Sequence, residues 1–373
     1  MESLIKLFKS ELPSHSYYNI DIDVDNLFHI NPIHSNNNCK VFIENHFTHG
    51  NKEGVFDVDF KSEYDESGKH THTTSLYLLG LLLQNLFYTR IKNDLNSRGI
   101  NHNDWYEEKD LVYTWYLTCL YHDIASCIEN KKIQELPCCN QCLFKKKSPF
   151  SHKTIFASEK IPRFSKKLVK NYCHYRISSG KQDHGIYGGI LLYDKLVKNF
   201  NSKTKGHDWK LQTDYVYEGL CWRREHLDHF AYVADAIICH NIWTVCSNDT
   251  ESVKNYKKYH LDELIIDPSS TPEKRLSIEE SPLQFMLCLL DTIEPVKRFS
   301  RLSAYEVLEN ISIKVTGDKS IRIAWNEIIK KESSFWDWMK NISGLKDWML
   351  VDISQCQQED DWCFVTINIG SKK

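Results

Sequence analysis

The sequence contains no long apolar run. No segment approaches the roughly 20 uninterrupted apolar residues of a membrane helix, so we expect no membrane span. The first residues are not followed by an apolar stretch, and we therefore expect no secretory signal. A strong charge of either sign is also lacking, because 47 Lys and Arg face 50 Asp and Glu, a net charge of -3. This balance gives no general attraction to nucleic acid or anionic lipid.

The cysteines do not suggest a disulfide framework. There are 13 of them, an odd number, scattered along the chain. Without an export signal, this usage predicts a reduced, cytoplasmic protein with free thiols. One group, Cys138, Cys139 and Cys142 with Cys173 downstream, leaves two interpretations open: a structural zinc site or an ordinary thiol-bearing loop.

What the chain does contain is apolar helical periodicity. Its 373 residues are 41% hydrophobic and 12% aromatic, enough for one large domain or a core with a smaller appendage. Apolar residues recur at helical spacing in five segments, with Asp183 as the expected cap of the third and a capping box at Ser281 opening the fifth. The five segments are 71–96, 109–129, 184 onward, 225–245 and 282 onward.

The pattern changes after residue 311. Residues 311–315 and 320–323 alternate around a turn and predict a hairpin, 325–342 are helical in pattern, and two further strands are expected near the C-terminus. We therefore predict a mainly α protein with an N-terminal extension (1–60), a helical domain (61–310) and a small α+β C-terminal domain (311–373). Two interpretations of this last domain stay open: it binds a regulator or a second subunit, or its clustered tryptophans simply fill a small core.

Each predicted helix of the central domain carries a histidine or an acid on its apolar side. These residues are His72, the adjacent His122 and Asp123, His184, His240 and Asp291. Such groups are costly in a core unless something satisfies them, and a divalent cation would satisfy them all. Taken singly, each is more often a satisfied core residue, so the joint pattern carries the prediction.

The adjacent pair suggests two metal positions. Neighbours at a helix end can reach two cations, so Asp123 is suited to bridge them. His72, His122, Asp123 and Asp291 would form the first position, and His184 and His240 would form the second. His70 is a rival to His72, but the Leu-Leu-Gly that follows favours His72.

The order His, His-Asp, His, His, Asp resembles the HD superfamily of metal-dependent phosphohydrolases. The surroundings of Tyr121–Ala125, Asp183–Ile186 and Leu290-Asp291 also resemble bacterial members, over about residues 65–305. The resemblance implies an HD-type helical bundle with the metals at its centre and the six residues as ligands. Ala125 replaces a glycine that many relatives have. The Gly-Tyr-Pro signature of the branch that degrades cyclic di-GMP is absent.

The function that follows is metal-dependent hydrolysis of a phosphoester or phosphodiester in a nucleotide-like substrate. A metal-bound hydroxide would be the nucleophile, and Asp123 and His184 would be the catalytic residues. His184 would also touch the substrate or the leaving group. The cofactors would be two divalent ions, chosen from Mn, Mg, Fe, Co, Ni and Zn. Phosphate usually meets Arg or Lys, and the candidates are Arg223, Arg224, Lys297 and Arg298, with a solvated surface as the alternative.

Two other functions stay open. A branch of the same superfamily uses the same four histidines and two aspartates around two irons as an oxygenase, and ligands alone do not set the metal. A non-catalytic nucleotide-binding sensor is the third possibility, although the complete ligand set argues against it. We expect a small phosphorylated partner and no membrane or nucleic-acid partner, and we leave a homo-oligomer open.

Overall fold

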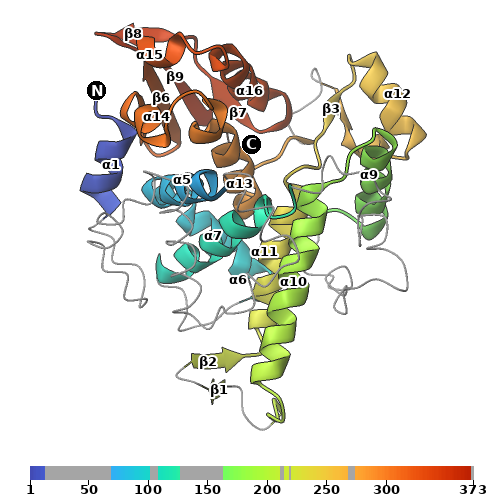
Figure 1. The fold of residues 1–373 in the computed structure, drawn as a ribbon. Coiled ribbons are helices and arrows are strands. Elements are labelled where there is room, and N and C mark those ends of the chain that lie inside the picture. The colour runs from blue at the N-terminus through green and yellow to red at the C-terminus, as the bar shows by residue number, and fades with distance from the viewer. Residues whose placement is uncertain are drawn as a thin grey trace.

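The protein is mainly helical, with a small sheet near its C-terminus (Figure 1), as the sequence predicted. The computed structural model describes residues 1–12, 69–100, 108–126, 163–210, 214–217, 220–267 and 274–370. The helices are α1 Leu4–Glu11, α5 Lys69–Leu82, α6 Tyr88–Ser97, α7 Glu108–His122, α9 Lys166–Ser178, α10 His184–Lys203, α11 His226–Cys239, α12 Thr250–Lys258, α13 Pro282–Ile293, α14 Ala304–Glu309, α15 Glu327–Lys330 and α16 Phe335–Trp348. Three short 3-10 helices are η2 Gln84–Leu86, η6 Asp262–Leu264 and η8 Val296–Arg298.

The strands are short outside the C-terminal region. They are β1 Asp214–Tyr217, β2 Leu220–Arg223, β3 Val245–Cys246, β4 Ile265–Ile266, β5 Ile311–Val315, β6 Ser320–Asn326, β7 Val351–Ile353, β8 Gln357–Glu359 and β9 Trp362–Ile369. The pairs β1–β2 and β3–β4 form small two-stranded sheets, antiparallel and parallel respectively.

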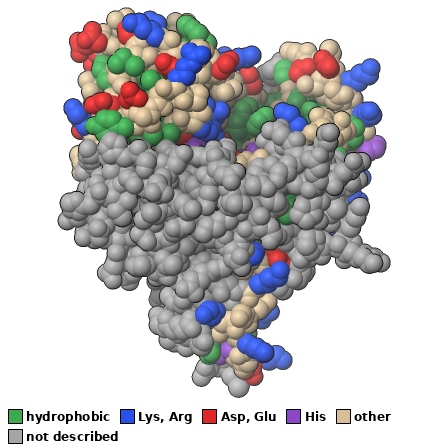
Figure 2. All heavy atoms as spheres, viewed as in Figure 1, with side chains coloured by type: hydrophobic (Ala, Val, Ile, Leu, Met, Phe, Trp, Pro, Cys, Tyr) green, Lys and Arg blue, Asp and Glu red, His purple; other side chains and the backbone are tan. Residues whose placement is uncertain are grey.

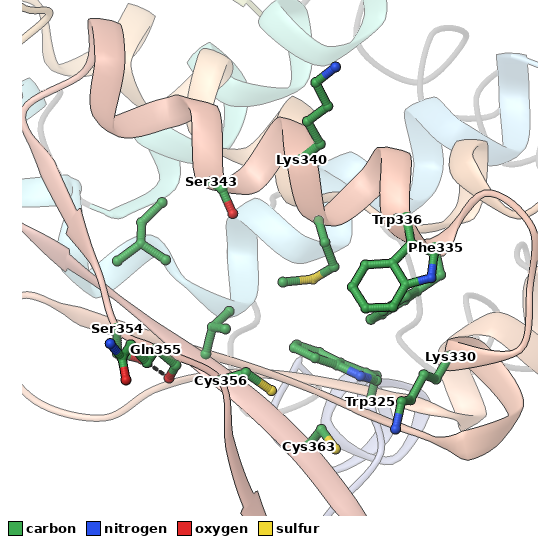
Figure 3. Close-up of a pocket in the computed structure, with 13 residues that line it drawn as sticks. Trp325, Lys330, Phe335, Trp336, Lys340, Ser343, Ser354, Gln355, Cys356 and Cys363 are labelled. Atoms are coloured by element: carbon green, nitrogen blue, oxygen red, sulfur yellow. Dashed lines mark hydrogen bonds between the residues drawn. The ribbon is translucent and has the colours of Figure 1, made fainter.

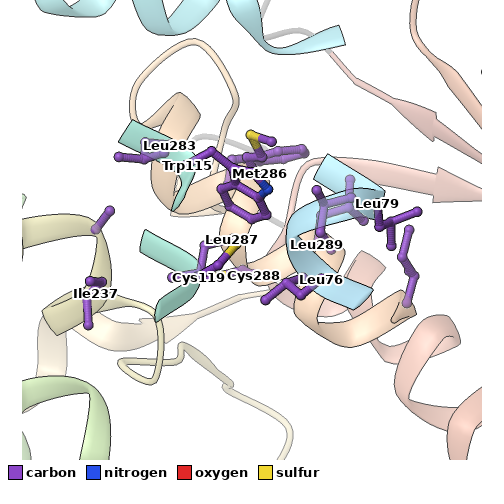
Figure 4. Close-up of a cluster of buried hydrophobic side chains, with 14 of the residues drawn as sticks. Leu76, Leu79, Trp115, Cys119, Ile237, Leu283, Met286, Leu287, Cys288 and Leu289 are labelled. Atoms are coloured by element: carbon purple, nitrogen blue, oxygen red, sulfur yellow. The ribbon is translucent and has the colours of Figure 1, made fainter. Parts of the chain in front are cut away.

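Helix α13 is the centre of the helical core. It is buried along nearly its whole length, and it contacts α5, α7, α11 and α16. Figure 4 shows the resulting cluster, in which Leu287 of α13 lies among Leu76 of α5, Cys119 of α7 and Ile237 of α11. Because α13 is apolar on every side, it can be packed by helices from several directions. This arrangement brings its C-terminal end, which carries Asp291, into the middle of the molecule.

Two glycines allow α10 to pack unusually close to its neighbours. A Cβ on Gly189 would lie 2.6 Å from the carbonyl oxygen of Ala234 in α11, and a Cβ on Gly188 would lie 2.6 Å from the carbonyl oxygen of Tyr121 in α7. Real Cβ atoms do not approach a backbone this closely. The close approach places the start of α10 beside the ends of α7 and α11 (Figure 1).

The helix ends partly follow the prediction. Asp183 caps α10, since its Oδ1 accepts the backbone N–H of Ile186 at 2.9 Å. The prediction of a capping box at Ser281 is wrong, because the side chain of Ser281 makes no capping hydrogen bond. The Gln284 side chain that the box requires instead donates to the carbonyl oxygen of Cys239 at 2.9 Å. Helix α11 ends at Cys239, well before residue 245, and His240 is its C-cap.

The C-terminal region is an antiparallel sheet covered by α16. Its strand order is β5-β6-β9-β7, with β8 paired to β9, and the predicted hairpin is confirmed as β5 and β6. The predicted helix at 325–342 starts too early, because Trp325 still pairs with Ile311 and Cys363 inside β6. Strand β8 was not predicted. Its three residues are all exposed, so they carry no alternating apolar signal.

The N-terminal helix packs against this end of the molecule. α1 contacts α5, α14 and β5 (Figure 1), so residues 4–11 join the two regions that the sequence separated. The rest of the predicted N-terminal extension lies outside the described residues, and so do Cys138, Cys139 and Cys142 of the possible zinc site. The fourth of those cysteines, Cys173, is buried in α9.

Charges of both signs are mixed on the one face that Figure 2 shows. On the face in Figure 2, Lys and Arg alternate with Asp and Glu over the C-terminal region. In the described ranges, no helix combines the length and the apolar character that a membrane crossing requires.

The close packing of α10 gives a stability test. Gly189→Ala should lower the free energy of unfolding by about 1–3 kcal/mol, because the added methyl collides with the α11 backbone and outweighs the better helix propensity of alanine. Gly344→Ala in α16 is the matched control. A Cβ there meets nothing within 4 Å, so we expect a gain of up to about 1 kcal/mol. Urea denaturation of both variants measures the difference, and a Gly189→Ala protein as stable as the wild type would contradict the packing.

Candidate metal centre

The six predicted residues lie at or near helix ends that meet in the interior. His122 is the last residue of α7, His184 is the first residue of α10, and His240 caps the end of α11. His72 lies in the first turn of α5 and Asp291 in the last turn of α13. Helix ends suit this purpose because a side chain there can point along the axis into a space that the neighbouring helices enclose.

Three of the residues form a compact group. His72 Nε2 lies 3.2 Å from His122 Nε2, and Asp291 Oδ1 lies 3.1 Å from His72 Nε2 and 3.5 Å from His122 Nε2. One ligand atom from each residue falls within 4.8 Å of the others. This buried group could hold a metal ion. His72, which the sequence favoured over His70, is the member from α5.

Asp123 faces two sides with its two carboxylate oxygens. Its Oδ2 lies 3.6 Å from both His72 Nε2 and His122 Nε2, and its Oδ1 lies 3.2 Å from His184 Nε2. The ring of His240 lies 5.2 Å from that of His184, measured between centroids. One carboxylate therefore joins a group of His72, His122 and Asp291 to a second group of His184 and His240.

The outer ring nitrogens of two histidines are held by the helices that carry them. His122 Nδ1 lies 2.6 Å from the carbonyl oxygen of Cys119, and His240 Nδ1 lies 2.6 Å from that of Ile237. In both cases the carbonyl is three residues earlier, at a helix end whose last carbonyls have no partner in the helix. A carbonyl only accepts, so Nδ1 carries a proton in both rings, and Nε2 is the nitrogen that faces the centre.

Glu294 orients the third histidine and was not predicted. His72 Nδ1 donates to Glu294 Oε2 at 2.7 Å, and Ser75 Oγ donates to Oε1 at 2.6 Å. The backbone N–H of Val296 also donates to Oε1, at 2.8 Å. A spacing of three on a helix could have pointed to both partners, since Ser75 follows His72 by three and Glu294 follows Asp291 by three. Asn241, also missed, places its amide nitrogen 3.0 Å from His184 Nε2.

Burial and neighbouring charge set the protonation of these groups. Burial, with the nearby rings of His184 and His122, lowers the pKa of His240 to about 3, so this ring is neutral at ordinary pH. Burial alone would raise the pKa of Asp291, but the Lys297 ammonium and hydrogen bonds from His122 and His72 bring it well below its usual value. Burial and Lys297 lower the pKa of His72, and the carboxylates of Glu294 and Asp291 more than offset them.

Of the four basic residues predicted to contact phosphate, Lys297 lies in the centre. Its Nζ donates to Asp291 Oδ1 and lies 3.3 Å from His72 Nε2. Arg298 reaches only the backbone carbonyl of Asp291, at 3.3 Å.

The structure does not bring Arg223 and Arg224 to the centre. They precede the first residue of α11, whereas His240 follows its last. The length of the intervening helix therefore separates them from His240 by about 20 Å, at the usual rise per helical residue. Their neighbours His226 and His229 are buried. His229 Nε2 lies 2.7 Å from Thr114 Oγ1, so this ring belongs to the packing between α11 and α7.

Comparisons with known proteins do not assign the chain to a family. No protein-family model matches the chain, and no curated protein and no solved structure is significantly similar to it. The arrangement of the described side chains is therefore the basis for any functional conclusion.

The hydrogen bond from His72 to Glu294 gives a second prediction. Glu294→Gln keeps the size of the side chain but removes the charge that favours Nδ1–H, so the affinity for Mn²⁺ should fall about tenfold or more. Calorimetric titration of metal-stripped protein measures it. Glu309→Gln, at the exposed end of α14, is the control and should bind like the wild type. Equal affinity in the folded Glu294→Gln protein would show that this carboxylate does not support the centre.

Proposed function

We propose that this protein is a metal-dependent phosphohydrolase with an HD-type centre that holds two divalent cations. The observation that carries the proposal is the placement of Asp123. One of its oxygens faces His72 and His122, and the other faces His184, as a carboxylate that bridges two cations would. The match in chain order to the HD superfamily supports the same assignment, with α5, α7, α10, α11 and α13 as its helical bundle.

The donor set suits cations on chemical grounds. His122 Nε2 lies within 3.5 Å of His72 Nε2 and Asp291 Oδ1, and Asp123 lies beside them. Buried nitrogen and oxygen ligands this close need positive charge among them, and the Lys297 ammonium beside Asp291 and His72 supplies part of it. Imidazole and carboxylate together fit Mn, Fe, Co, Ni or Zn, and the position of Asp123 between the two groups supports a proposal of two ions. Bound there, such ions would activate a water molecule near neutral pH and neutralise charge on a phosphoryl group.

The exposed members of the centre indicate where a substrate would bind. The side chains of His184, Asp291 and Lys297 are 13, 22 and 19% exposed, whereas those of His72 and His122 are almost fully buried. A phosphoryl group that approached from this side would meet the Lys297 ammonium and the His184 ring first. Lys297 would bind its negative charge, and His184 is placed to pass a proton to the leaving oxygen.

Lys297 also contacts two of the candidate ligands. Its ammonium lies against Asp291 and His72, and Glu294 holds the same segment in place by accepting the backbone N–H groups of Val296 and Lys297. A lysine is a compact point charge on a flexible stem. It can therefore balance the charge of Asp291, and it would turn toward a phosphate when a cation supplies that balance.

The central test of the proposal is a turnover screen with Asp123→Asn. Metal-stripped protein is supplied with Mn²⁺, Mg²⁺, Fe²⁺, Co²⁺ or Ni²⁺ and tested on nucleotides, cyclic nucleotides and generic phosphodiesters for phosphate or phosphomonoester release. We expect release with at least one metal and a fall in kcat/KM of at least about a hundredfold in Asp123→Asn, because the bridge between the two positions is lost.

Two controls sharpen this screen. Asp347→Asn, an exposed aspartate of α16, should behave like the wild type. Parallel reactions with Fe²⁺, with and without O₂, distinguish hydrolysis from oxygenase chemistry, since hydrolysis does not need oxygen. Turnover that survives in Asp123→Asn, or that consumes O₂ without releasing phosphate, would sink the proposal.

Lys297→Met separates the two roles of this lysine. Removal of a positive charge beside the ligands should raise the affinity for Mn²⁺ by at least about threefold, because like charges no longer repel. The same change should lower kcat/KM for a phosphoester, because a phosphate contact is lost. Lys331→Met, exposed after α15, is the control. Tighter metal binding with undiminished turnover would remove Lys297 from the substrate site.

A further inference from the structure

A cavity lies in the C-terminal region, between α16 and the sheet. It measures about 510 Å³, within the usual range for small-molecule sites. Figure 3 shows Trp325, Phe335 and Trp336 gathered on one side of it, with Ser354, Gln355 and Cys356 across from them. These side chains come from β6, from α16 and from the segment between β7 and β8. None of them belongs to the metal centre.

Two of the tryptophans are unusual for a simple domain core. Trp336 is 69% exposed, the highest value among the exposed large apolar side chains of the described residues. Trp325 is almost fully buried, and its indole Nε1 has no hydrogen-bond partner among the described residues. The exposed Trp336 ring at the edge of the cavity is therefore a surface on which another aromatic ring can stack.

The charge at the cavity is positive only. Lys330 and Lys340 line it, and no carboxylate is among the described residues that do so. Lys330 Nζ forms an ion pair with Glu327 Oε1 at 2.9 Å, whereas Lys340 forms no ion pair with a described residue. Aromatic surface for stacking and a cationic rim together define one kind of ligand.

We infer that this cavity binds a small planar aromatic molecule that carries an anionic group. Its ring would lie against Trp336 and Phe335, and the anion would face Lys340 and Lys330. This site is independent of the proposed hydrolysis, because it needs neither a metal nor turnover. It would also give the regulator binding expected of the C-terminal domain a specific place.

The test uses naphthalene sulfonate as the probe on the full-length protein. Calorimetry measures its binding, with naphthalene methanol as a neutral analogue of the same ring. We expect saturable one-to-one binding with a Kd of about a millimolar or tighter, and weaker binding of the alcohol. Added salt should weaken the sulfonate and leave the alcohol unchanged, because salt screens the lysine charges.

Four variants locate the site. Trp336→Ala should weaken sulfonate binding by up to about tenfold through the lost stacking, and Lys340→Gln by about threefold through the lost charge. Ile328→Ala removes another exposed apolar side chain, and Lys346→Gln removes another exposed lysine of α16, so both should bind as the wild type does. All four positions are exposed, so folding should survive. The inference is wrong if the wild type shows no saturable binding, if the alcohol binds equally well, or if the controls weaken as much as Trp336→Ala.

Discussion

The repulsion among buried acceptors at the centre is the constraint on which the rest of the structure depends. Lone pairs of imidazole and oxygens of carboxylate do not gather in a core unless a positive charge balances them. Here they gather from five helices, and Asp123 stands between two sets of them. The Lys297 ammonium supplies part of that charge beside Asp291 and His72, and the packing of the helices holds the groups in place.

Packing provides most of that restraint. The apolar α13 fills the middle of the bundle, so the backbone position of Asp291 is fixed by a buried helix. The glycines of α10 let its backbone touch α7 and α11, which fixes His184 against Asp123. The ring hydrogen bonds to Cys119 and Ile237 then leave His122 and His240 one useful orientation each.

Periodicity and helix position predicted the helices that bring the six side chains together and the first C-terminal hairpin. They did not predict α9 or α12, and they gave one helix over 71–96 where the structure has α5, η2 and α6. Glu294 was also missed despite its spacing of three from Asp291, because a single acid after an apolar helix resembles any surface acid until its partners are known. They also misplaced the end of α11, where apolar residues continue through Ile242 although the His240 ring already caps the helix. Arg223 and Arg224 precede the right helix, but at the wrong end, and sequence proximity to a ligand does not reveal that distance.

The hydrogen bonds to Glu294 also show how the C-terminal region is connected to the centre. Glu294 holds His72 with one oxygen and, through backbone N–H groups, the start of the segment that carries Lys297. That segment leads into Phe299, whose ring packs at 5.5 Å against Trp338 of α16. Trp338 packs in turn against Trp325, which lines the aromatic cavity. A continuous series of packed rings therefore links the C-terminal region to the segment that carries Lys297, so the appendage and the candidate centre share one packed core.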